Sequence, residues 1–326
     1  MKALQFIGDA RAQMTDLPIP RIAADEVLLA ARAVGVCHSD IELLEGRYII
    51  PFEYPVIPGH EWAGEIVEVG GDVRDLAVGD RVVGECVIGA DHFGFSISGA
   101  AAEFFVARPE WLHRLPESMS WTQGALVEPF SCGYYATLRA DDLDAGDTVA
   151  VFGAGPIGLG VVAAAAAKGA HVIVIEPAAD RAALALRLGA EVQVDTIGAG
   201  LVDAVLAATA GRGASVVIEA TGNPAAMAAM LEVAAFRARL VNIGINVGGA
   251  APAGLGLIQS KELQIRGIIG SPGVWARTLD FIARTGLDLS PMVTATLPLT
   301  DAVKAVELAH HGRDQVKVHV VSEAGL

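Results

Sequence analysis

The chain has 326 residues, of which 53% are hydrophobic and 37 are glycine, and its formal net charge at pH 7 is −15. This length favours about two domains of roughly 150 residues each over a single one, and so apolar a composition excludes an intrinsically disordered protein. The negative charge argues against nucleic acid as a partner, because binding a phosphate backbone requires clustered Lys and Arg.

The N-terminus "MKALQFIGDARAQM" has no apolar segment of the kind that marks a secretory signal. The three cysteines, Cys37, Cys86 and Cys132, are too few for a disulfide framework, as is usual in a reducing compartment. Residues 148–167 carry no charge, but their four glycines and one proline divide them into a strand, a turn and a helix rather than a membrane span. We therefore expect a cytoplasmic protein that does not enter a membrane.

Short alternating strands broken by Gly, Pro and Asp are predicted for residues 1–120, as in "EIVEVGGDVRDLAVGDRVVG" at residues 65–84. Within this β-rich region Cys37 and His60 stand 23 positions apart, Glu61 follows the histidine, and Glu128 lies further along. Such side chains are ligands of Zn²⁺, and a catalytic zinc site uses about three of them with one position left open. Without further support a second interpretation remains, in which Cys37 is a small buried hydrophobe, His60 a turn residue and the acids serve no metal.

From residue 147 onward, buried-type strands such as "TVAVFG", "HVIVIE", "SVVIEATG" and "RLVNIG" alternate with helical stretches rich in alanine and leucine. This alternation predicts a parallel sheet covered on both faces. The segment after residue 270 is mixed, with the helical stretches "GVWARTLDFIARTG" and "LTDAVKAVELAHHG" and a closing strand "QVKVHVV".

The first of these strands leads into a glycine-rich turn. Gly153, Gly155 and Gly158 have the spacing GxGxxG between a strand and a helix, which predicts a tight turn, close backbone approach to a pyrophosphate and close packing of helix on strand. Glu176 ends the next strand, where an acid accepts hydrogen bonds from both ribose hydroxyls and repels a phosphate. Arg181 either stacks on the adenine or lies on the helix surface. We therefore expect NAD rather than NADP.

In their order along the chain, the motifs "GVCHSD", "PVIPGHEWAGEIVEVG", "GDRV", "GALVEPFSCGYYA", "GAGPIG", "IEATG" and "SKELQIRGIIGS" resemble the zinc-dependent medium-chain dehydrogenase/reductase family. The run "GALVEPFS" is similar to the sorbitol and threonine dehydrogenase branch, because simple alcohol dehydrogenases usually have a cysteine at the position of Glu128. The resemblance implies an α/β protein with a GroES-like catalytic domain, residues 1–130 and 271–326, and a Rossmann NAD-binding domain, residues 131–270.

The resemblance also implies roles for individual residues. Cys37 and His60, with Glu128 or Glu61, would hold one catalytic zinc ion per chain, and we expect only one of the two glutamates to bind it at a time. Ser39 would accept the proton of the substrate, and His38 would lie near the pyrophosphate or on the proton relay. Further contacts to the cofactor are implied at Ile157, Thr221, Ile243, Ile245 and Ile269.

One segment departs from the family pattern. Many relatives hold a second, structural zinc with four closely spaced cysteines after the "GDRV" strand, where this chain retains only Cys86. One thiolate cannot hold a tetrahedral ion. We therefore expect a shortened loop that carries Asp91, His92 and Phe93 toward the active site, with His92 solvated rather than bound to metal.

The resulting hypothesis is a zinc-dependent oxidation of a secondary alcohol, a polyol, cyclitol, aminocyclitol or amino alcohol, with NAD as the hydride acceptor. The alternatives are a zinc-independent NADPH enone or quinone reductase and a non-catalytic protein of the same fold. Aromatic side chains at Tyr48, Phe52, Phe93 and Phe95 would line the substrate pocket, together with the polar residues Ser39, Glu45, Asp91 and His92.

The apolar segment "RLVNIGINVGG", residues 239–249, resembles the edge strand through which family members pair their sheets. An apolar edge of this kind is an aggregation hazard in a monomer. We therefore expect a homodimer or homotetramer.

Overall fold

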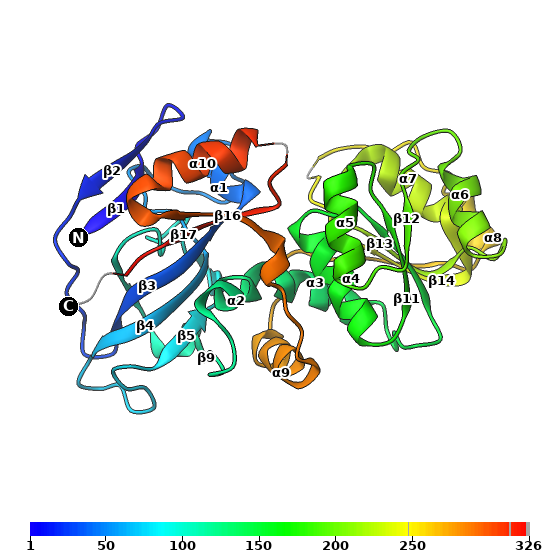
Figure 1. Ribbon diagram of the computed structural model, residues 1–326. Coiled ribbons are helices and arrows are strands. Elements are labelled where there is room, and N and C mark those ends of the chain that lie inside the picture. The colour runs from blue at the N-terminus through cyan, green and yellow to red at the C-terminus, as the bar shows by residue number, and fades with distance from the viewer. Residues whose placement is uncertain (247, 313, 324–326) are drawn as a thin grey trace. The chain divides into compact units, whose positions relative to one another are not determined.

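A computed structural model describes residues 1–246, 248–312 and 314–323 (Figure 1). The chain forms two compact units, one made of Met1–Glu128 with Trp275–Leu326 and the other of Pro129–Val274. The first unit is rich in antiparallel strands and the second contains a parallel sheet, so the expected α/β fold class is confirmed.

The first unit is organised around a seven-stranded sheet in the order β16-β17-β3-β4-β5-β9, with β8 also paired to β3. The longest strand, β3, is apolar along almost its whole length, as expected for a strand covered on both faces. The strands of this unit are β1 (Lys2–Phe6), β2 (Ala12–Asp16), β3 (Val27–Val36), β4 (Glu61–Val69), β5 (Arg81–Gly84), β6 (Val87–Ile88), β7 (Asp91–His92), β8 (Phe104–Ala107), β9 (Leu112–Arg114), β16 (Val293–Pro298) and β17 (Lys317–Val321).

Short helices connect and cover these strands. They are α1 (His38–Leu44), η1 (Pro109–Trp111), α2 (Trp121–Ala125), α9 (Trp275–Thr285), η2 (Ser290–Met292), η3 (Leu299–Asp301) and α10 (Ala302–His311), while α3 (Val127–Arg139) begins in this unit and continues into the other. The C-terminal part of the chain thus returns to the first unit, where β17 lies antiparallel to β3. This return brings residues near 317 beside residues near 36.

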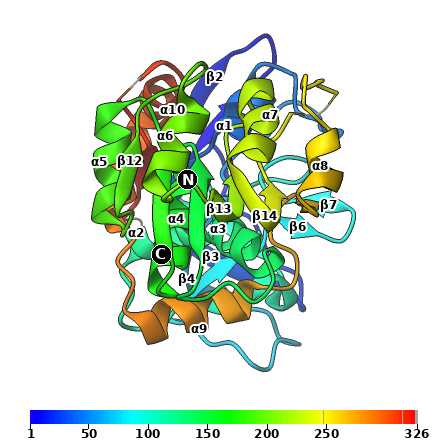
Figure 2. The same ribbon diagram turned by 90° about the vertical axis from the view of Figure 1, so that its right-hand side faces the viewer.

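The second unit has a six-stranded sheet in the order β12-β11-β10-β13-β14-β15, with all its pairs parallel. Helices α4 and α5 pack together on one face, and α6 and α7 on the other (Figures 1 and 2). The elements are β10 (Thr148–Phe152), α4 (Pro156–Ala167), β11 (His171–Ile175), α5 (Ala179–Arg187), β12 (Val192–Val194), α6 (Leu201–Ala208), β13 (Ala214–Glu219), α7 (Pro224–Val233), β14 (Ala234–Asn242), α8 (Gly256–Ser260) and β15 (Gln264–Gly267).

The uncharged run at residues 148–167 forms β10, a turn and α4. Eight residues of α4 are buried, which explains why this helix is apolar on every side. Within the described ranges, none of the helices combines the length and the apolar character that crossing a bilayer requires.

The prediction that residues 239–249 form the edge of the sheet is wrong. Strand β14 ends at Asn242 and is paired on both sides, with β13 and with β15, so β15 is the edge strand. The sequence pattern did not reveal β15 as a strand because this segment, "QIRG", is short and half polar. Val247, which belongs to the predicted edge, lies outside the described residues.

Candidate metal centre

The candidate metal ligands meet where two antiparallel strands begin and end. Cys37 follows the last residue of β3, and His60 precedes the first residue of β4. The register pairs Gly35 with Glu61, so the end of one strand faces the start of the other. Among the described residues, Cys37, His60 and Glu61 form a group whose donor atoms all lie within 4.8 Å of one another.

Gly35 leaves the space that the Glu61 carboxylate occupies. A Cβ atom at this position would lie 2.3 Å from Oε2 of Glu61, far inside van der Waals contact. Any side chain there would displace the carboxylate from the group, so the glycine of "GVCHSD" has a packing function next to the site.

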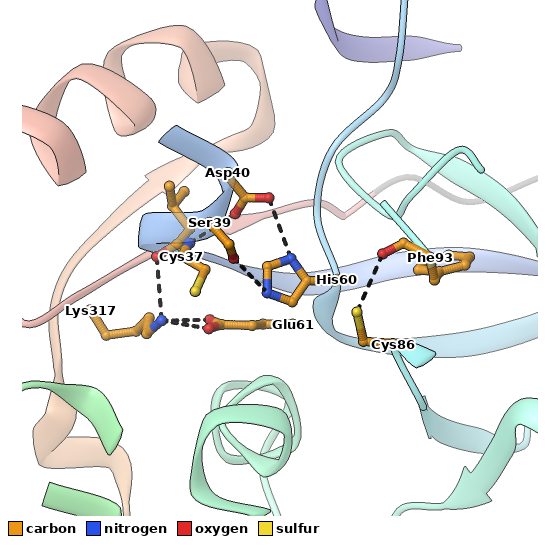
Figure 3. Close-up of polar contacts among 9 residues, drawn as sticks. Cys37, Ser39, Asp40, His60, Glu61, Cys86, Phe93 and Lys317 are labelled. Carbon is orange, nitrogen blue, oxygen red and sulfur yellow. Dashed lines mark hydrogen bonds and ion pairs between the residues drawn. The ribbon is translucent and has the colours of Figure 1, made fainter. Parts of the chain in front are cut away.

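Asp40 fixes both the backbone of Cys37 and the ring of His60 (Figure 3). One carboxylate oxygen accepts a hydrogen bond from the Cys37 N–H at 2.8 Å, and the other lies 3.3 Å from Nδ1 of His60. The second ring nitrogen, Nε2, therefore points away from Asp40, and Ser39 Oγ lies 3.5 Å from it. A carboxylate on the far side of a histidine is the usual way in which proteins orient a metal-binding imidazole.

Charges around His60 outweigh the effect of its burial. Burial alone would lower the pKa of His60, but the negative charge of the Asp40 carboxylate and polar contacts with Asp40 and Cys37 raise it well above its usual value. The site thus stabilises positive charge at the imidazole, and the acidic surroundings that favour the proton would also favour a cation bound there.

Glu61 is paired with a lysine from the far end of the chain. Lys317 Nζ lies 2.7 Å from both carboxylate oxygens of Glu61 and donates to the Val36 carbonyl at 3.3 Å (Figure 3). The side chains of Lys317 and Glu61 are 2% and 1% exposed. Burial would lower the pKa of Lys317, but Glu61 and Cys37 raise it, so the lysine stays charged. Lys317 therefore competes with a metal ion for the Glu61 carboxylate.

Glu128 lies in the first turn of α3 and is not part of the group formed by the donor atoms of Cys37, His60 and Glu61. Its carboxyl group still interacts electrostatically with His60, Glu61 and Lys317. Desolvation raises the pKa of Glu128 to about 7, with a contribution from the negative charge of Glu61. The two glutamates are thus close enough to influence each other, as two carboxylates competing for one ion would be.

The donor set fits zinc. A thiol, an imidazole and a carboxylate converge, one imidazole nitrogen is held by Asp40 while the other faces the group, and Glu128 supplies a further carboxylate nearby. Cys37 and His60, with Glu61 or Glu128, would hold the ion. Because Lys317 pairs with Glu61, it would influence which of the two glutamates binds.

The shortened loop after β5 forms a small hairpin from β6 and β7. Phe93, expected in the substrate pocket, is 2% exposed and packs against Trp62 and Phe105 in the core. Cys86 donates weakly to the Phe93 carbonyl at 3.8 Å, and burial raises the pKa of the Cys86 thiol to about 12. The loop between β5 and β8 is therefore anchored in the core by Phe93, and its Cys86 thiol is neutral.

The remaining predicted pocket residues of this unit differ in their surroundings. Phe95 is 1% exposed and lies between the rings of Tyr48 and His60. The carboxylate of Asp91 accepts from Ser96, and the backbone N–H of His92 donates to the same hydroxyl. Two more of these residues have partners outside the metal group: Phe52 packs edge-on against Tyr54, and Glu45 pairs with Arg47 and His310. His38, the predicted relay or pyrophosphate residue, is exposed.

The glycine-rich turn lies between β10 and α4 in the second unit. A Cβ atom on Gly158 would lie 2.0 Å from the Gly153 carbonyl oxygen, so only glycine permits this contact between helix and strand. Both oxygens of Glu176 accept backbone hydrogen bonds at 2.9 Å, one from Ala154 within the turn and one from Ala178. Each carboxylate oxygen can accept a second bond, so capacity for ribose hydroxyls remains.

Other predicted cofactor contacts surround this turn or follow the strands beside it. The Thr221 methyl group lies 2.6 Å from the position of a Cβ on Gly153, which places the threonine against the turn. Ile245 and Ile269 are 63% and 66% exposed, as expected for apolar residues that a cofactor would cover. The less exposed members of the set are Ile157, Arg181 and Ile243.

Asp40 and Lys317 belong to the site, but sequence reasoning did not identify them. Asp40 had a signal, because an acid three residues after a helix-capping position is typical of a capping box. Lys317 and His319 alternate with Val318 and Val320 in the closing strand, which indicates two polar residues on one face of a buried strand. Nothing in the local sequence connects that strand with Glu61.

Comparisons with known proteins cover most of the chain. Residues 23–117 match the family described as alcohol dehydrogenase GroES-like domain, and residues 156–284 match the zinc-binding dehydrogenase family. The chain is 31% identical to D-arabitol-phosphate dehydrogenase of Enterococcus avium over 98% of its own length and 96% of that protein. It is 32% identical to sorbitol dehydrogenase of Bacillus subtilis over 95% and 93%.

Among solved structures, 2R,3R-butanediol dehydrogenase from Bacillus subtilis superimposes with a TM-score of 0.89 at 30% identity, with 99% of each chain covered. The similarity thus extends over both units and includes the segments that carry the metal group and the glycine turn.

Proposed function

The chain belongs to the zinc-dependent medium-chain dehydrogenase/reductase family, and on this premise we propose that it transfers a hydride between a secondary alcohol of the polyol class and NAD. The observation that carries the proposal is the convergence of Cys37, His60 and Glu61 within 4.8 Å, with Asp40 behind the imidazole. A zinc-independent reductase or a non-catalytic relative has no use for such a group.

In this proposal each side chain around the ion has its own task. When bound, zinc supplies a Lewis acid that makes the alcohol more acidic, and NAD supplies the hydride acceptor. Ser39, whose hydroxyl lies beside Nε2 of His60, accepts the proton of the alcohol. Asp40 keeps the imidazole oriented, and His38, which is exposed, passes the proton onward or binds the pyrophosphate.

In this proposal either Glu61 or Glu128, but not both, would hold the ion at one time. Cys37 and one carboxylate together neutralise Zn²⁺, whereas two carboxylates would leave a net negative site that holds a developing negative charge poorly. Lys317 would hold the Glu61 carboxylate whenever Glu128 held the ion, because its Nζ contacts both oxygens of Glu61 at 2.7 Å.

NAD is the proposed coenzyme. Glu176 is 7% exposed, its carboxylate accepts a hydrogen bond from Ala154 of the glycine turn, and residues 177–180 contain no Lys or Arg that could neutralise a 2′-phosphate. The relatives named above act on arabitol phosphate, sorbitol and butanediol according to their names, so a substrate with neighbouring hydroxyl groups is proposed.

Steady-state assays test this function. Protein loaded with zinc is assayed with NAD⁺ against a panel of polyols, cyclitols, amino alcohols and simple secondary alcohols, and zinc is measured by elemental analysis. The expected result is one zinc per chain and reduction of NAD⁺ by at least one secondary alcohol. Absence of turnover with the whole panel, in protein that holds zinc and binds NADH, would refute it.

A homodimer or homotetramer is the proposed assembly, with β15 at the contact. This edge strand has Ile265 41% exposed, and Phe236 at the start of the neighbouring strand β14 is 60% exposed. An uncovered apolar edge favours pairing with a second chain. Light scattering that shows a monomer at micromolar concentration would contradict this.

A further inference from the structure

Tyr48 has an aromatic partner on its ring but no protein partner on its hydroxyl. Its ring stacks on Phe95 with a centroid distance of 4.1 Å and an interplanar angle of 10°. Among the residues that the structure describes, none forms a hydrogen bond with the Tyr48 hydroxyl. The stacking would be equally available to phenylalanine, so packing does not account for the hydroxyl group.

The position of Tyr48 connects it to the metal centre. Phe95, which contacts Tyr48, also packs against the imidazole of His60 at a centroid distance of 4.7 Å. One aromatic ring therefore separates Tyr48 from a proposed zinc ligand. The phenol also interacts electrostatically with His60 and Cys37 of the metal group and with Cys86.

Two side chains near Tyr48, Phe95 and Cys86, carry no charge. Phe95 is 1% exposed, and Cys86 is a neutral thiol because burial raises its pKa to about 12. Burial also raises the pKa of Tyr48, so the phenol stays protonated and can both donate and accept. Tyr48 is half-buried, and a hydroxyl without a protein partner beside an aromatic ring is the kind of polar group that orients a ligand.

A neighbouring tyrosine shows the contrast. The Tyr54 hydroxyl donates to the carbonyls of Leu43 and Leu44 at the end of α1, so its function is structural. Tyr48 and Tyr54 lie six residues apart in the same segment of the chain, and only Tyr54 uses its hydroxyl within the protein.

We propose that Tyr48 is a specificity-determining residue, whose hydroxyl hydrogen-bonds a second hydroxyl group of the substrate, on the carbon next to the reacting one. The inference rests on the proposed function, because the reacting oxygen must lie at the metal group. The ring of Phe95 separates Tyr48 from His60, so the Tyr48 hydroxyl is placed for an oxygen on the neighbouring carbon rather than for the oxygen at the metal. The site then selects vicinal diols and polyols over simple secondary alcohols.

Two alcohols that differ by one hydroxyl group test this: 2,3-butanediol and 2-butanol. In the zinc-loaded enzyme with NAD⁺, the ratio of kcat/KM for the diol to that for 2-butanol is expected to fall about tenfold in Tyr48→Phe, the effect of one lost hydrogen bond. Tyr54→Phe removes a hydroxyl from the same segment and is expected to leave the ratio unchanged. An unchanged ratio in Tyr48→Phe, or an equal fall with both alcohols, would overturn the proposal.

Two further measurements need no active variant. The wild-type enzyme is expected to favour the diol over 2-butanol by at least about tenfold, and equal values would overturn the assignment. If neither alcohol is oxidised, the proposed function is judged by the full panel of alcohols, and Tyr48 is tested by binding instead. The diol, and not 2-butanol, is then expected to raise the melting temperature of the zinc-loaded protein with NADH, and this shift is expected to disappear in Tyr48→Phe.

Discussion

The metal centre and the glycine turn both contain a buried glutamate, but the two carboxylates are satisfied in different ways. Glu176 accepts hydrogen bonds from the backbone of Ala154 and Ala178, which belong to the same turn and to the residues just after it. Glu61 depends on the side chain of Lys317, which is 256 positions away. A carboxylate held by backbone groups keeps its partners as long as the local fold exists, whereas one held by a remote charge depends on the whole unit. The metal centre is therefore the region that single substitutions should disturb most.

Replacing Lys317 with Met should give the largest effect. It leaves Glu61 buried without a countercharge, and removing one partner of a buried ion pair costs about 3–5 kcal/mol. We expect the free energy of unfolding of the metal-free protein, measured with urea, to fall by that amount. Lys304→Met, at an exposed position of α10, is the matched control and should change little.

A double substitution separates the pair from mere packing. Lys317→Met combined with Glu61→Gln removes both charges and should recover much of the loss. If the double variant is no more stable than Lys317→Met alone, loss of the ion pair does not cause the destabilisation of Lys317→Met.

Removing zinc with a chelator should lower kcat at least about a hundredfold, because a bound metal ion stabilises the transition state of such reactions by several kcal/mol. Binding of NADH, followed by its fluorescence, should persist, since the glycine turn and Glu176 belong to the other unit. Restored activity on adding one equivalent of zinc completes the test. Loss of NADH binding together with the metal would show that the two regions are not independent.

Substituting either competing glutamate should have a smaller but clear effect. Glu61→Gln and Glu128→Gln are each expected to lower kcat more than about tenfold while NADH binding is retained, because each removes a carboxylate that the ion needs at one stage. Glu68→Gln, at an exposed position of β4, serves as the control. Full activity and full zinc occupancy in both variants would exclude both residues from the site.

The glycine turn is probed by the choice of coenzyme. We expect kcat/KM with NAD to exceed that with NADP by about tenfold or more, because a 2′-phosphate beside Glu176 places two negative charges together. Glu176→Gln should reduce this preference. A wild-type enzyme that prefers NADP would show that Glu176 does not face the ribose.

A further test of the metal-centre unit is the pH dependence of stability contributed by His319. This residue of β17 is fully buried, and neither ring nitrogen has a hydrogen-bond partner among the described residues. Burial and the positive charge of Lys317 lower its pKa from 6.5 to about 3. Below pH 6.5, His319 is therefore protonated in the unfolded chain but stays neutral in the folded protein until the pH approaches 3.

Stability should consequently fall as the pH is lowered from 6.5 toward 3, by at most about 1.4 kcal/mol per pH unit for this one group. Urea unfolding of the wild type and of His319→Leu over this range measures the contribution. The variant should show a flatter pH profile, and identical profiles would mean that His319 is protonated in the folded protein as well.

Much of the fold follows from the sequence, because its signals are local. The strands β10, β11, β13 and β14, the glycine turn and Glu176 were all predicted from patterns within about thirty residues, which is the length of one βαβ unit. The short polar strand β15 carried no such signal, and the edge of the sheet was therefore assigned to β14 in error.

The candidate site shows the same division. By itself the sequence determined which residue types are present, Cys37, His60, Glu61 and Glu128, and the resemblance to a family indicated their use. Only the tertiary structure placed Lys317 on Glu61, Asp40 behind His60 and Tyr48 one ring away from the imidazole. The physical reason is that strand periodicity and turn chemistry act between near neighbours, whereas pairing of β17 with β3, and of β3 with β4, decides which distant charges and rings meet.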